Sequence, residues 1–291
     1  MTSKILITGA SGGFGKRTVL ALLQRGHAVA ASMRAVAGKN AGVAAELRQA
    51  GATVVEMDVT QDASVNAGVE AAILALGSID AVVNNAGVGV LGVQETFTPD
   101  DFKRLFDVNV FGVQRVNRAV LPHMRARGSG LLLQISSLLG RIAIPFYGPY
   151  NASKWAVEAM AENYRVELSG FGVDVAIVEP GGFPTTFIDA LMRPSDRSRD
   201  ATLNGMPEFT QKFLHDFEQA LAANPAQDPQ LVADAVVQVI ETPAGQRKFR
   251  TVVDRIGMGA AIEPYNDQLE KIEAGIYGAF GIGHLRQVKS R

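Results

Sequence analysis

The sequence predicts an α/β protein built on one doubly wound parallel sheet of about seven strands, with helices on both faces. Short apolar runs alternate with longer amphipathic segments along most of the 291 residues. This alternation is typical of parallel strands joined by crossover helices. The apolar runs are rich in valine, isoleucine and leucine without regular polar positions. Such composition indicates strands that are buried on both faces.

The expected elements follow each other in a regular order. The predicted strands are Lys4–Thr8, His27–Ser32, Thr53–Met57, Ala81–Val83, Leu131–Ser136, Asp174–Glu179 and Lys248–Val253. The predicted helical segments are Gly15–Arg25, Ala41–Ala50, Ala63–Leu76, Pro99–Arg127, Tyr150–Ser169 and Pro229–Glu241.

The expected organisation is one domain over residues 1–255 with a helical extension, residues 256–291, packed on the same domain. Residues 182–228 form a connection that is long for a compact domain, which is typical of lids and binding loops. This segment carries phenylalanines at helical spacing, and the extension carries apolar residues on a predicted helix. These are Phe209, Phe213 and Phe217 in the lid, and Tyr265, Ile272, Ile276 and Tyr277 in the extension.

Composition excludes several functional classes. A net charge of -1 and a pI near 6.4 argue against nucleic-acid or anionic-membrane binding through a global field. The absence of cysteine excludes disulfides and thiolate catalysis. No metal site is expected, because the histidines are scattered without ligand spacing. These histidines are His27, His123, His215 and His284.

The chain is expected to be a cytoplasmic protein without a membrane span. The apolar run that follows Met1 to Lys4 is too short for a signal-peptide core. Polar residues interrupt the longest apolar stretch, so no segment reaches the roughly 18 residues of a membrane helix.

A glycine-rich turn predicts a dinucleotide site. The run from Thr8 to Gly15 reads TGASGGFG, and it follows the first strand and opens the first helix. Glycines allow a tight turn in which backbone N–H groups approach a pyrophosphate, and the helix N-terminus adds its positive dipole end. This context indicates a Rossmann-type fold.

The end of the second strand favours NADP(H). It reads Ser32-Met33-Arg34, with no acidic residue before Glu46 to hold a ribose 2′-hydroxyl. The Arg34 guanidinium can pair with a 2′-phosphate, and Lys39 can add charge. The alternatives are a solvated loop arginine and an NAD-preferring dehydrogenase.

Tyr150 and Lys154 form a candidate acid/base pair. They lie four residues apart, so on a helix they project from one face. An adjacent ammonium favours the phenolate, which predicts a Tyr150 pKa below the usual value of ~10. The pair is then suited to general acid/base catalysis near neutral pH.

These residues and several motifs resemble the short-chain dehydrogenase/reductase family in its compact branch. The resemblance covers roughly the first 185 residues and rests on short motifs at family spacing. Gly9, Gly12 and Gly15 also fit the turn of the family's extended branch, but the Asn-Asn-Ala-Gly and Tyr-x-Ala-Ser-Lys forms decide for the compact branch. The remaining motifs are Asp58-Val59, Asn84-Asn85-Ala86-Gly87, Asn109, Ser137 and Pro180-Gly181.

The resemblance implies a catalytic tetrad of Asn109, Ser137, Tyr150 and Lys154. In it Tyr150 donates a proton, Ser137 binds the substrate oxygen and Lys154 holds the nicotinamide ribose. Asn109 holds a water that links Lys154 to solvent. The chain departs from the family pattern at Pro184, beside Thr185. The expected cofactor contacts are Gly9, Ser11, Gly13, Phe14, Gly15, Arg34, Asp58, Val59, Asn85, Ala86, Gly87, Tyr150, Lys154, Pro180, Gly181, Phe183 and Thr185.

The expected function is therefore an NADP(H)-dependent oxidoreductase acting on a carbonyl or secondary alcohol. Its pocket residues are mostly apolar, which indicates a moderately apolar substrate, although they are equally explained as lid packing. Two alternatives are an NADPH-binding redox-sensing regulator and an extended-branch epimerase or dehydratase, which would need a larger C-terminal domain. The expected pocket residues are Leu138, Ile144, Phe146, Tyr147, Phe183 and Phe187.

The resemblance also implies a homodimer or homotetramer. The pairing helices would be Pro99–Arg127 and Tyr150–Ser169, with Trp155 and Tyr164 serving either the interface or the core.

Overall fold

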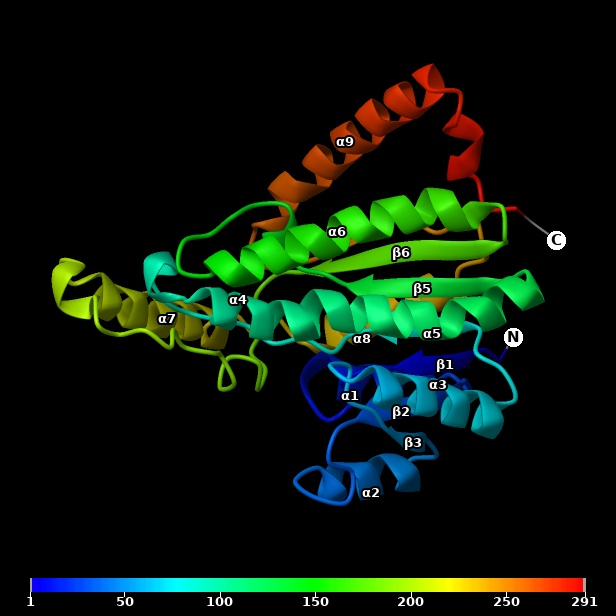
Figure 1. The fold of residues 1–291 in the computed structure, drawn as a ribbon, viewed down its shortest axis with the longest axis horizontal. Helices are drawn as coiled ribbons and strands as arrows, with labels where there is room; N and C mark the ends of the chain where they lie inside the picture. The colour runs from blue at the N-terminus through cyan, green and yellow to red at the C-terminus, as the bar shows by residue number, and fades with distance from the viewer. Residues whose placement is uncertain (1, 290–291) are drawn as a thin grey trace.

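A parallel seven-stranded sheet forms the centre of the molecule. The computed structural model describes residues 2–289, and its strand order is β3-β2-β1-β4-β5-β6-β7 (Figure 1). Every neighbouring pair is parallel, so the fold predicted from the sequence is confirmed. The strands are β1 Lys4–Ile7, β2 Ala28–Met33, β3 Thr53–Glu56, β4 Ala81–Asn84, β5 Gly130–Ile135, β6 Val173–Pro180 and β7 Arg250–Val253.

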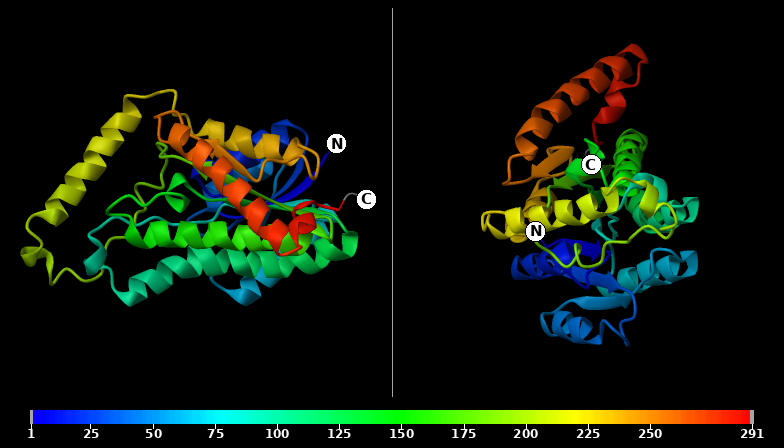
Figure 2. Two further views of the ribbon diagram at one scale, coloured as in Figure 1. Left: turned by 90° about the horizontal axis from the view of Figure 1, so that it is seen from above. Right: turned by 90° about the vertical axis from the view of Figure 1, so that its left-hand side faces the viewer.

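Helices cover both faces of the sheet (Figure 2). One core joins the sheet to α1, α2 and α8, and a second joins the opposite face to α3, α5 and α6. Ile5 and Ile7 enter the first core and Leu6 enters the second, so both faces of β1 are buried. The helices are α1 Gly13–Gln24, α2 Ala41–Gln49, α3 Asp62–Leu76, α4 Pro99–Phe106, α5 Gly112–Arg127, α6 Gly148–Ser169, α7 Met206–Ala222, α8 Gln230–Glu241 and α9 Gly259–Ala279.

The strand order reverses between β1 and β4, which opens a crevice at the carboxyl edge of the sheet. The chain runs outward from β1 to β3 and then returns to β4 on the other side of β1. Ligands of open α/β sheets bind at such a switch point. The glycine turn, Asn84, Ser137 and Pro180 all lie at this edge, because each ends or follows a parallel strand.

The predicted helix Pro99–Arg127 is not continuous. A capping box of Thr98 and Asp101 starts α4, and a wider π-helical turn at Asp107–Phe111 separates it from α5. Single π-turns of this kind are frequent at functional sites. The sequence contains no glycine or proline at which this break could be predicted within Asp107–Phe111.

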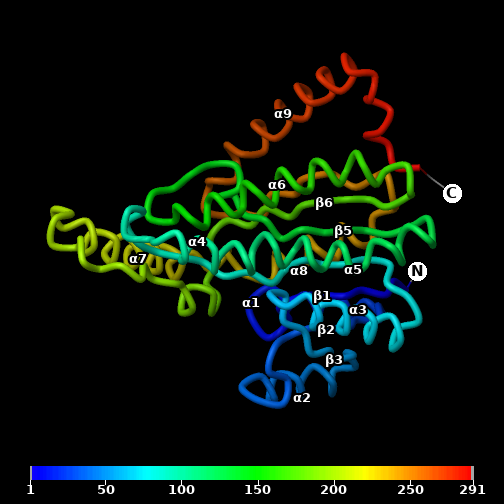
Figure 3. The backbone as a smooth tube through the Cα atoms, viewed as in Figure 1, coloured from blue at the N-terminus to red at the C-terminus, as the bar shows by residue number. Residues whose placement is uncertain are grey.

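Two helices lie outside the sheet layers. Helix α7 belongs to the long connection after β6 and extends beyond the end of the sheet (Figure 3). Helix α9 confirms the helix expected in the C-terminal tail and runs obliquely to α6 (Figure 2), to which Arg165 ties it through Glu270. Within residues 2–289, no helix is long and apolar enough to cross a membrane.

Candidate active site

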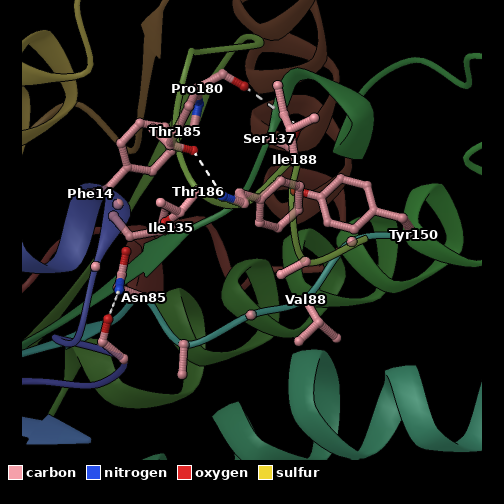
Figure 4. Close-up of a pocket in the computed structure, with 18 of the residues that line it drawn as sticks. Phe14, Asn85, Val88, Ile135, Ser137, Tyr150, Pro180, Thr185, Thr186 and Ile188 are labelled. Carbon is pink, nitrogen blue, oxygen red and sulfur yellow. Dashed lines mark hydrogen bonds between the residues drawn. The ribbon is translucent and has the colours of Figure 1, made fainter. Parts of the chain in front are cut away.

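A cavity of about 670 Å³ lies at the carboxyl edge of the sheet, beneath α7 and the segment that precedes it. Figure 4 shows its residues converging from several strand ends and from α6. All but two of the predicted site residues line this cavity; Gly15 and Asn109 lie behind its wall. The predicted residues that line it are Gly9, Ser11, Gly13, Phe14, Arg34, Asp58, Val59, Asn85, Ala86, Gly87, Ser137, Tyr150, Lys154, Pro180, Gly181, Phe183 and Thr185.

The turn after β1 has the shape that a pyrophosphate requires. Gly9 and Gly13 adopt φ values of 69° and 50°, which favour glycine. A Cβ on Gly15 would lie 2.4 Å from the Gly9 carbonyl oxygen, so Gly15 allows α1 to pack against the turn. The first turn of α1 has no capping side chain and no acidic residue. Its N–H groups therefore fit an anionic group.

Asn85 braces the glycine turn as well as lining the cavity. Its Nδ2 donates to the carbonyl oxygens of Thr8 at 2.9 Å and Gly9 at 3.1 Å. The Thr8 hydroxyl in turn accepts from the backbone of Asn85 at 3.1 Å and of Ala86 at 3.0 Å. The ends of β1 and β4 are thus tied together at the switch point.

A short loop presents Arg34 at the far end of the cavity. The Glu56 carboxylate accepts from Ala35 N at 3.0 Å and Val36 N at 3.2 Å, and Asn40 Nδ2 donates to the Arg34 carbonyl at 2.6 Å. Glu56 and Asn40 were missed in the sequence, because their contacts depend on how the loop folds back. The Arg34 guanidinium is about half exposed and lies 3.9 Å from Asp58.

Asp58 is held as a carboxylate. Partial burial works to raise its pKa, but hydrogen bonds from the Thr60 backbone and hydroxyl and the charge of Arg34 lower it below the usual value. The Thr60 backbone N lies 3.0 Å, and its hydroxyl 2.8 Å, from Asp58 Oδ1.

Tyr150 and Lys154 lie together on α6, but the predicted lowering of the Tyr150 pKa is wrong for this structure. The Lys154 Nζ lies 5.5 Å from the Tyr150 ring centroid and donates to the Ile135 carbonyl at 2.8 Å. Burial raises the pKa of Tyr150, and the Ser137 hydroxyl only partly opposes this. Burial also lowers the pKa of Lys154 to about 8, against the effect of Glu158. Desolvation therefore outweighs the pairing that the sequence suggested.

Ser137 stands at the end of β5, facing the same space. Its hydroxyl accepts from Leu139 N at 3.1 Å and lies 3.4 Å from the Pro180 carbonyl oxygen, to which it donates (Figure 4). The first contact caps the 3-10 turn Leu138–Gly140. The hydroxyl is thus anchored by two neighbouring segments.

The π-turn carries Asn109, whose side chain lies beside Val88 and Ser153. Its Oδ1 accepts from Val88 N at 2.9 Å, and its Nδ2 donates to the Val88 carbonyl at 2.9 Å and to Ser153 Oγ at 3.1 Å. Gly87 separates Asn109 from Lys154, since a Cβ there would lie 3.5 Å from Asn109 Oδ1 and 3.9 Å from Lys154 Nζ.

Comparison with known proteins identifies the family. A family model described as short chain dehydrogenase matches residues 3–195. The chain belongs to this family. As a short-chain dehydrogenase it is an oxidoreductase that binds a nicotinamide cofactor and acts on alcohol or carbonyl groups.

Its relatives among short-chain dehydrogenases act on different molecules. The chain is 40% identical to 3-ketodihydrosphingosine reductase of Bacteroides thetaiotaomicron over 64% of this chain and 65% of that protein. It is 32% identical to bovine retinol dehydrogenase 8 over 85% of this chain and 80% of that protein. A short-chain dehydrogenase from Streptomyces avermitilis has a similar structure, with 28% identity, a TM-score of 0.73 and coverage of 97% and 98% of the two chains.

Apolar side chains line much of the cavity of this short-chain dehydrogenase, and some lie beside the polar groups: the Phe187 ring centroid is 5.7 Å from that of Tyr150. The predicted residues Leu138, Ile144, Tyr147, Phe183 and Phe187 line the cavity. Further apolar residues were not singled out as pocket residues in the sequence, although the spacing of Phe213 and Phe217 was a signal for them. They are Val88, Ile188, Leu191, Phe213, Phe217 and Met258.

Phe146 does not line the cavity, in contrast to the prediction. Its φ is 73°, which turns the loop before α6, and its ring packs 5.7 Å from Phe209 and 5.6 Å from Phe213 between centroids. It fastens this loop to α7 instead.

Proposed function

We propose that the protein is an NADP(H)-dependent oxidoreductase that transfers a hydride between nicotinamide and an uncharged, moderately apolar ketone, aldehyde or alcohol. The observation that carries the proposal is that Tyr150, Ser137 and Lys154 line one cavity together with many apolar side chains. The polar groups stabilise the charge that develops on the substrate oxygen, and the apolar side chains bind the rest of the substrate.

The bound nicotinamide cofactor supplies or accepts the hydride. Tyr150 keeps its proton when no charge develops beside it, because burial raises its pKa, and it gives that proton to the substrate oxygen as negative charge builds there. The Ser137 hydroxyl hydrogen-bonds the same oxygen. Lys154 binds the ribose hydroxyls and stabilises the phenolate that results.

Arg34 supports the preference for NADP(H). Its guanidinium lines the cavity beside Asp58, where a 2′-phosphate can be reached. Similar structures are described with either cofactor, one with NAD and another with 5-hydroxy-NADP. The remaining predicted cofactor contacts line the same cavity, and Gly15 shapes the turn.

The charges around the cavity favour an uncharged substrate. Among the residues described, the charged side chains that line it are Arg34, Lys39, Asp58 and Lys154, which belong to the cofactor and catalytic ends. The names of two relatives fit such substrates: 3-ketodihydrosphingosine reductase, and human 17-beta-hydroxysteroid dehydrogenase type 1, which is 31% identical over 85% of this chain.

We further propose a cytoplasmic homodimer or homotetramer. The absence of cysteine is compatible with a reducing compartment, and Phe111 on the π-turn and Trp155 on α6 are half exposed.

The test is oxidation of NADPH with a panel of uncharged ketones and aldehydes, 3-ketodihydrosphingosine among them, by the wild-type protein and by Tyr150→Phe. We expect turnover to fall about 10²- to 10⁴-fold in this variant, because the proton donor is lost. NADPH affinity, measured by calorimetry, should change little.

Tyr147→Phe is the matched control, since Tyr147 also lines the cavity and lies half-buried nearby. It should retain turnover. Near-normal turnover of Tyr150→Phe would overturn the mechanism. Binding of NADPH without turnover across the panel would instead favour a redox-sensing regulator.

A further inference from the structure

A buried ionic cluster lies directly behind the catalytic residues. Glu158 on α6 and Glu179 on β6 face Arg141, after β5, and Arg250 on β7, and none of the four side chains is more than 5% exposed. Arg250 Nε lies 2.9 Å from Glu158 Oε2 and 3.5 Å from Glu179 Oε1. Arg141 is more distant, at 3.9 Å from Glu158 and 3.8 Å from Glu179. Buried charges of this kind require additional hydrogen bonds to be held in place.

Helix α9 supplies two hydrogen bonds to this cluster through one side chain. Asn266 Oδ1 accepts from Arg141 Nε at 2.9 Å, and Asn266 Nδ2 donates to Glu179 Oε2 at 2.6 Å. The ring of Tyr265, the preceding residue, lies 5.0 Å from the Arg141 guanidinium carbon. The amide of Asn266 thus joins the Arg141 guanidinium to the Glu179 carboxyl group, which approach each other to 3.8 Å.

Each partner of Asn266 is linked to Ser137 through a short segment of chain or one hydrogen bond. Arg141 ends the turn that begins at Ser137, with Arg141 N donating to the Leu138 carbonyl at 2.9 Å. Glu179 directly precedes Pro180, whose carbonyl oxygen accepts the Ser137 hydroxyl at 3.4 Å. The two groups that hold the Ser137 hydroxyl, Leu139 N and the Pro180 carbonyl oxygen, therefore each lie one or two residues from a member of the cluster.

The 3-10 turn Leu138–Gly140 also packs closely against α6. A Cβ on Gly140 would lie 3.0 Å from Glu158 Cγ and 3.3 Å from the Lys154 carbonyl oxygen. A shift of Arg141 or Glu158 would therefore move the turn relative to the helix that carries Tyr150 and Lys154.

We propose that Asn266 is a positioning residue for the reaction, holding the Ser137 hydroxyl in place by bridging Arg141 and Glu179. The C-terminal helix then acts as part of the active-site scaffold. This inference rests on the proposed function, in which Ser137 binds the substrate oxygen. Hydrogen-bond donors at a reacting oxygen act through their position, and a displacement of about 1 Å can reduce turnover by about 10²-fold.

The first measurement is steady-state kinetics of Asn266→Ala with NADPH and the most active ketone of the panel. We expect kcat to fall about 10-fold or more, with the NADPH dissociation constant nearly unchanged. Gln268→Ala removes an exposed amide from the same helix and should retain kcat. Glu270→Ala should also retain it, because Glu270 fastens the far part of α9 to Arg165 at 2.9 Å and Arg286 at 2.8 Å.

The second measurement repeats Asn266→Ala in a Ser137→Ala background. If Asn266 acts through Ser137, the second substitution should add little further loss. Arg141→Gln should likewise lose little further turnover in the Ser137→Ala background. Trp155 is the single tryptophan, and its ring lies 6.0 Å from Arg141, so its fluorescence should report movement of Arg141 in Asn266→Ala. If Asn266→Ala does not fold, Asn266→Asp is used, because it keeps the acceptor for Arg141 and loses the donor to Glu179.

Three results would overturn the inference: an unchanged kcat in Asn266→Ala, an equal loss in both backgrounds, or an equal loss in Glu270→Ala. Full turnover of Ser137→Ala alone would contradict the proposed function instead.

Discussion

Burial acts on Tyr150 and Lys154 in the direction that favours the uncharged form of each. The phenol keeps its proton more firmly than a free tyrosine, and the ammonium loses its proton near pH 8 rather than at 10.5. A proton donor benefits from the first shift. The second shift limits the pH range over which Lys154 is charged.

We therefore predict that kcat/KM for NADPH falls as the pH rises through about 8. In the proposed mechanism, Lys154 below this pH carries the charge that binds the ribose and stabilises the phenolate, and above it the charge is lost. The carboxylate of Glu158 works to raise this pKa, so Glu158→Gln should begin its fall at a lower pH. A pH profile that stays flat through this range would contradict the role of Lys154.

In the proposed function, Arg34 is the residue on which cofactor choice depends. Arg34→Ala should weaken NADPH binding about 10- to 100-fold and NADH binding much less, because a charge-assisted contact to phosphate contributes about 1.5–3 kcal/mol. Dissociation constants for both cofactors measure this. The control is Arg48→Ala, which removes an exposed arginine from α2. Equal weakening of NADPH and NADH would refute the phosphate contact.

At the scale of elements, the π-turn between α4 and α5 explains the position of Asn109. A regular helix across Asp107–Phe111 would rotate the following residues, whereas the wider turn lets one amide pair with both the N–H and the carbonyl of Val88. Asn109 was recognisable in the sequence, but the turn that carries it was not, because the stability of the turn depends on a partner in a distant loop.

Asn109→Ala should destabilise the protein by about 2–4 kcal/mol, since two backbone groups of Val88 lose their partners at about 1–3 kcal/mol each. Chemical denaturation measures this loss, and turnover should fall with it. Asn163→Ala is the comparison, because Asn163 lies exposed on α6 and bonds only the Ala159 carbonyl of its own helix. Similar stabilities of the two variants would argue against this account of the π-turn.

At the scale of the whole molecule, two exposed apolar residues lie where the proposed subunit interface would form. Phe111 on the π-turn and Trp155 on α6 are 50% and 43% exposed, on the helices through which pairing is proposed. Tyr164 instead donates its hydroxyl to Gln114 at 2.7 Å, which joins α6 to α5 within one chain. The division into a domain of residues 1–255 and an extension of residues 256–291 stays a prediction, though Asn266 ties the extension to the sheet.

We expect light scattering to show a homodimer or homotetramer, and Phe111→Glu to shift it toward monomer, because a charge would be buried in the interface. Leu74→Glu is the matched control, since Leu74 on α3 is 86% exposed and lies on neither pairing helix. A monomeric wild-type protein, or dissociation by Leu74→Glu alone, would contradict the proposed interface.

The sequence by itself determined the sheet, the order of its elements and most residues that line the cavity. These depend on local patterns: an apolar run specifies a buried strand, and a glycine turn must follow the strand that it ends. Tertiary structure alone decided the electrostatics of Tyr150 and Lys154, the π-turn, the outward packing of Phe146 and the bridge from Asn266 to Arg141. Each of these depends on burial or on contacts between residues distant in the chain, and neither is encoded in local spacing.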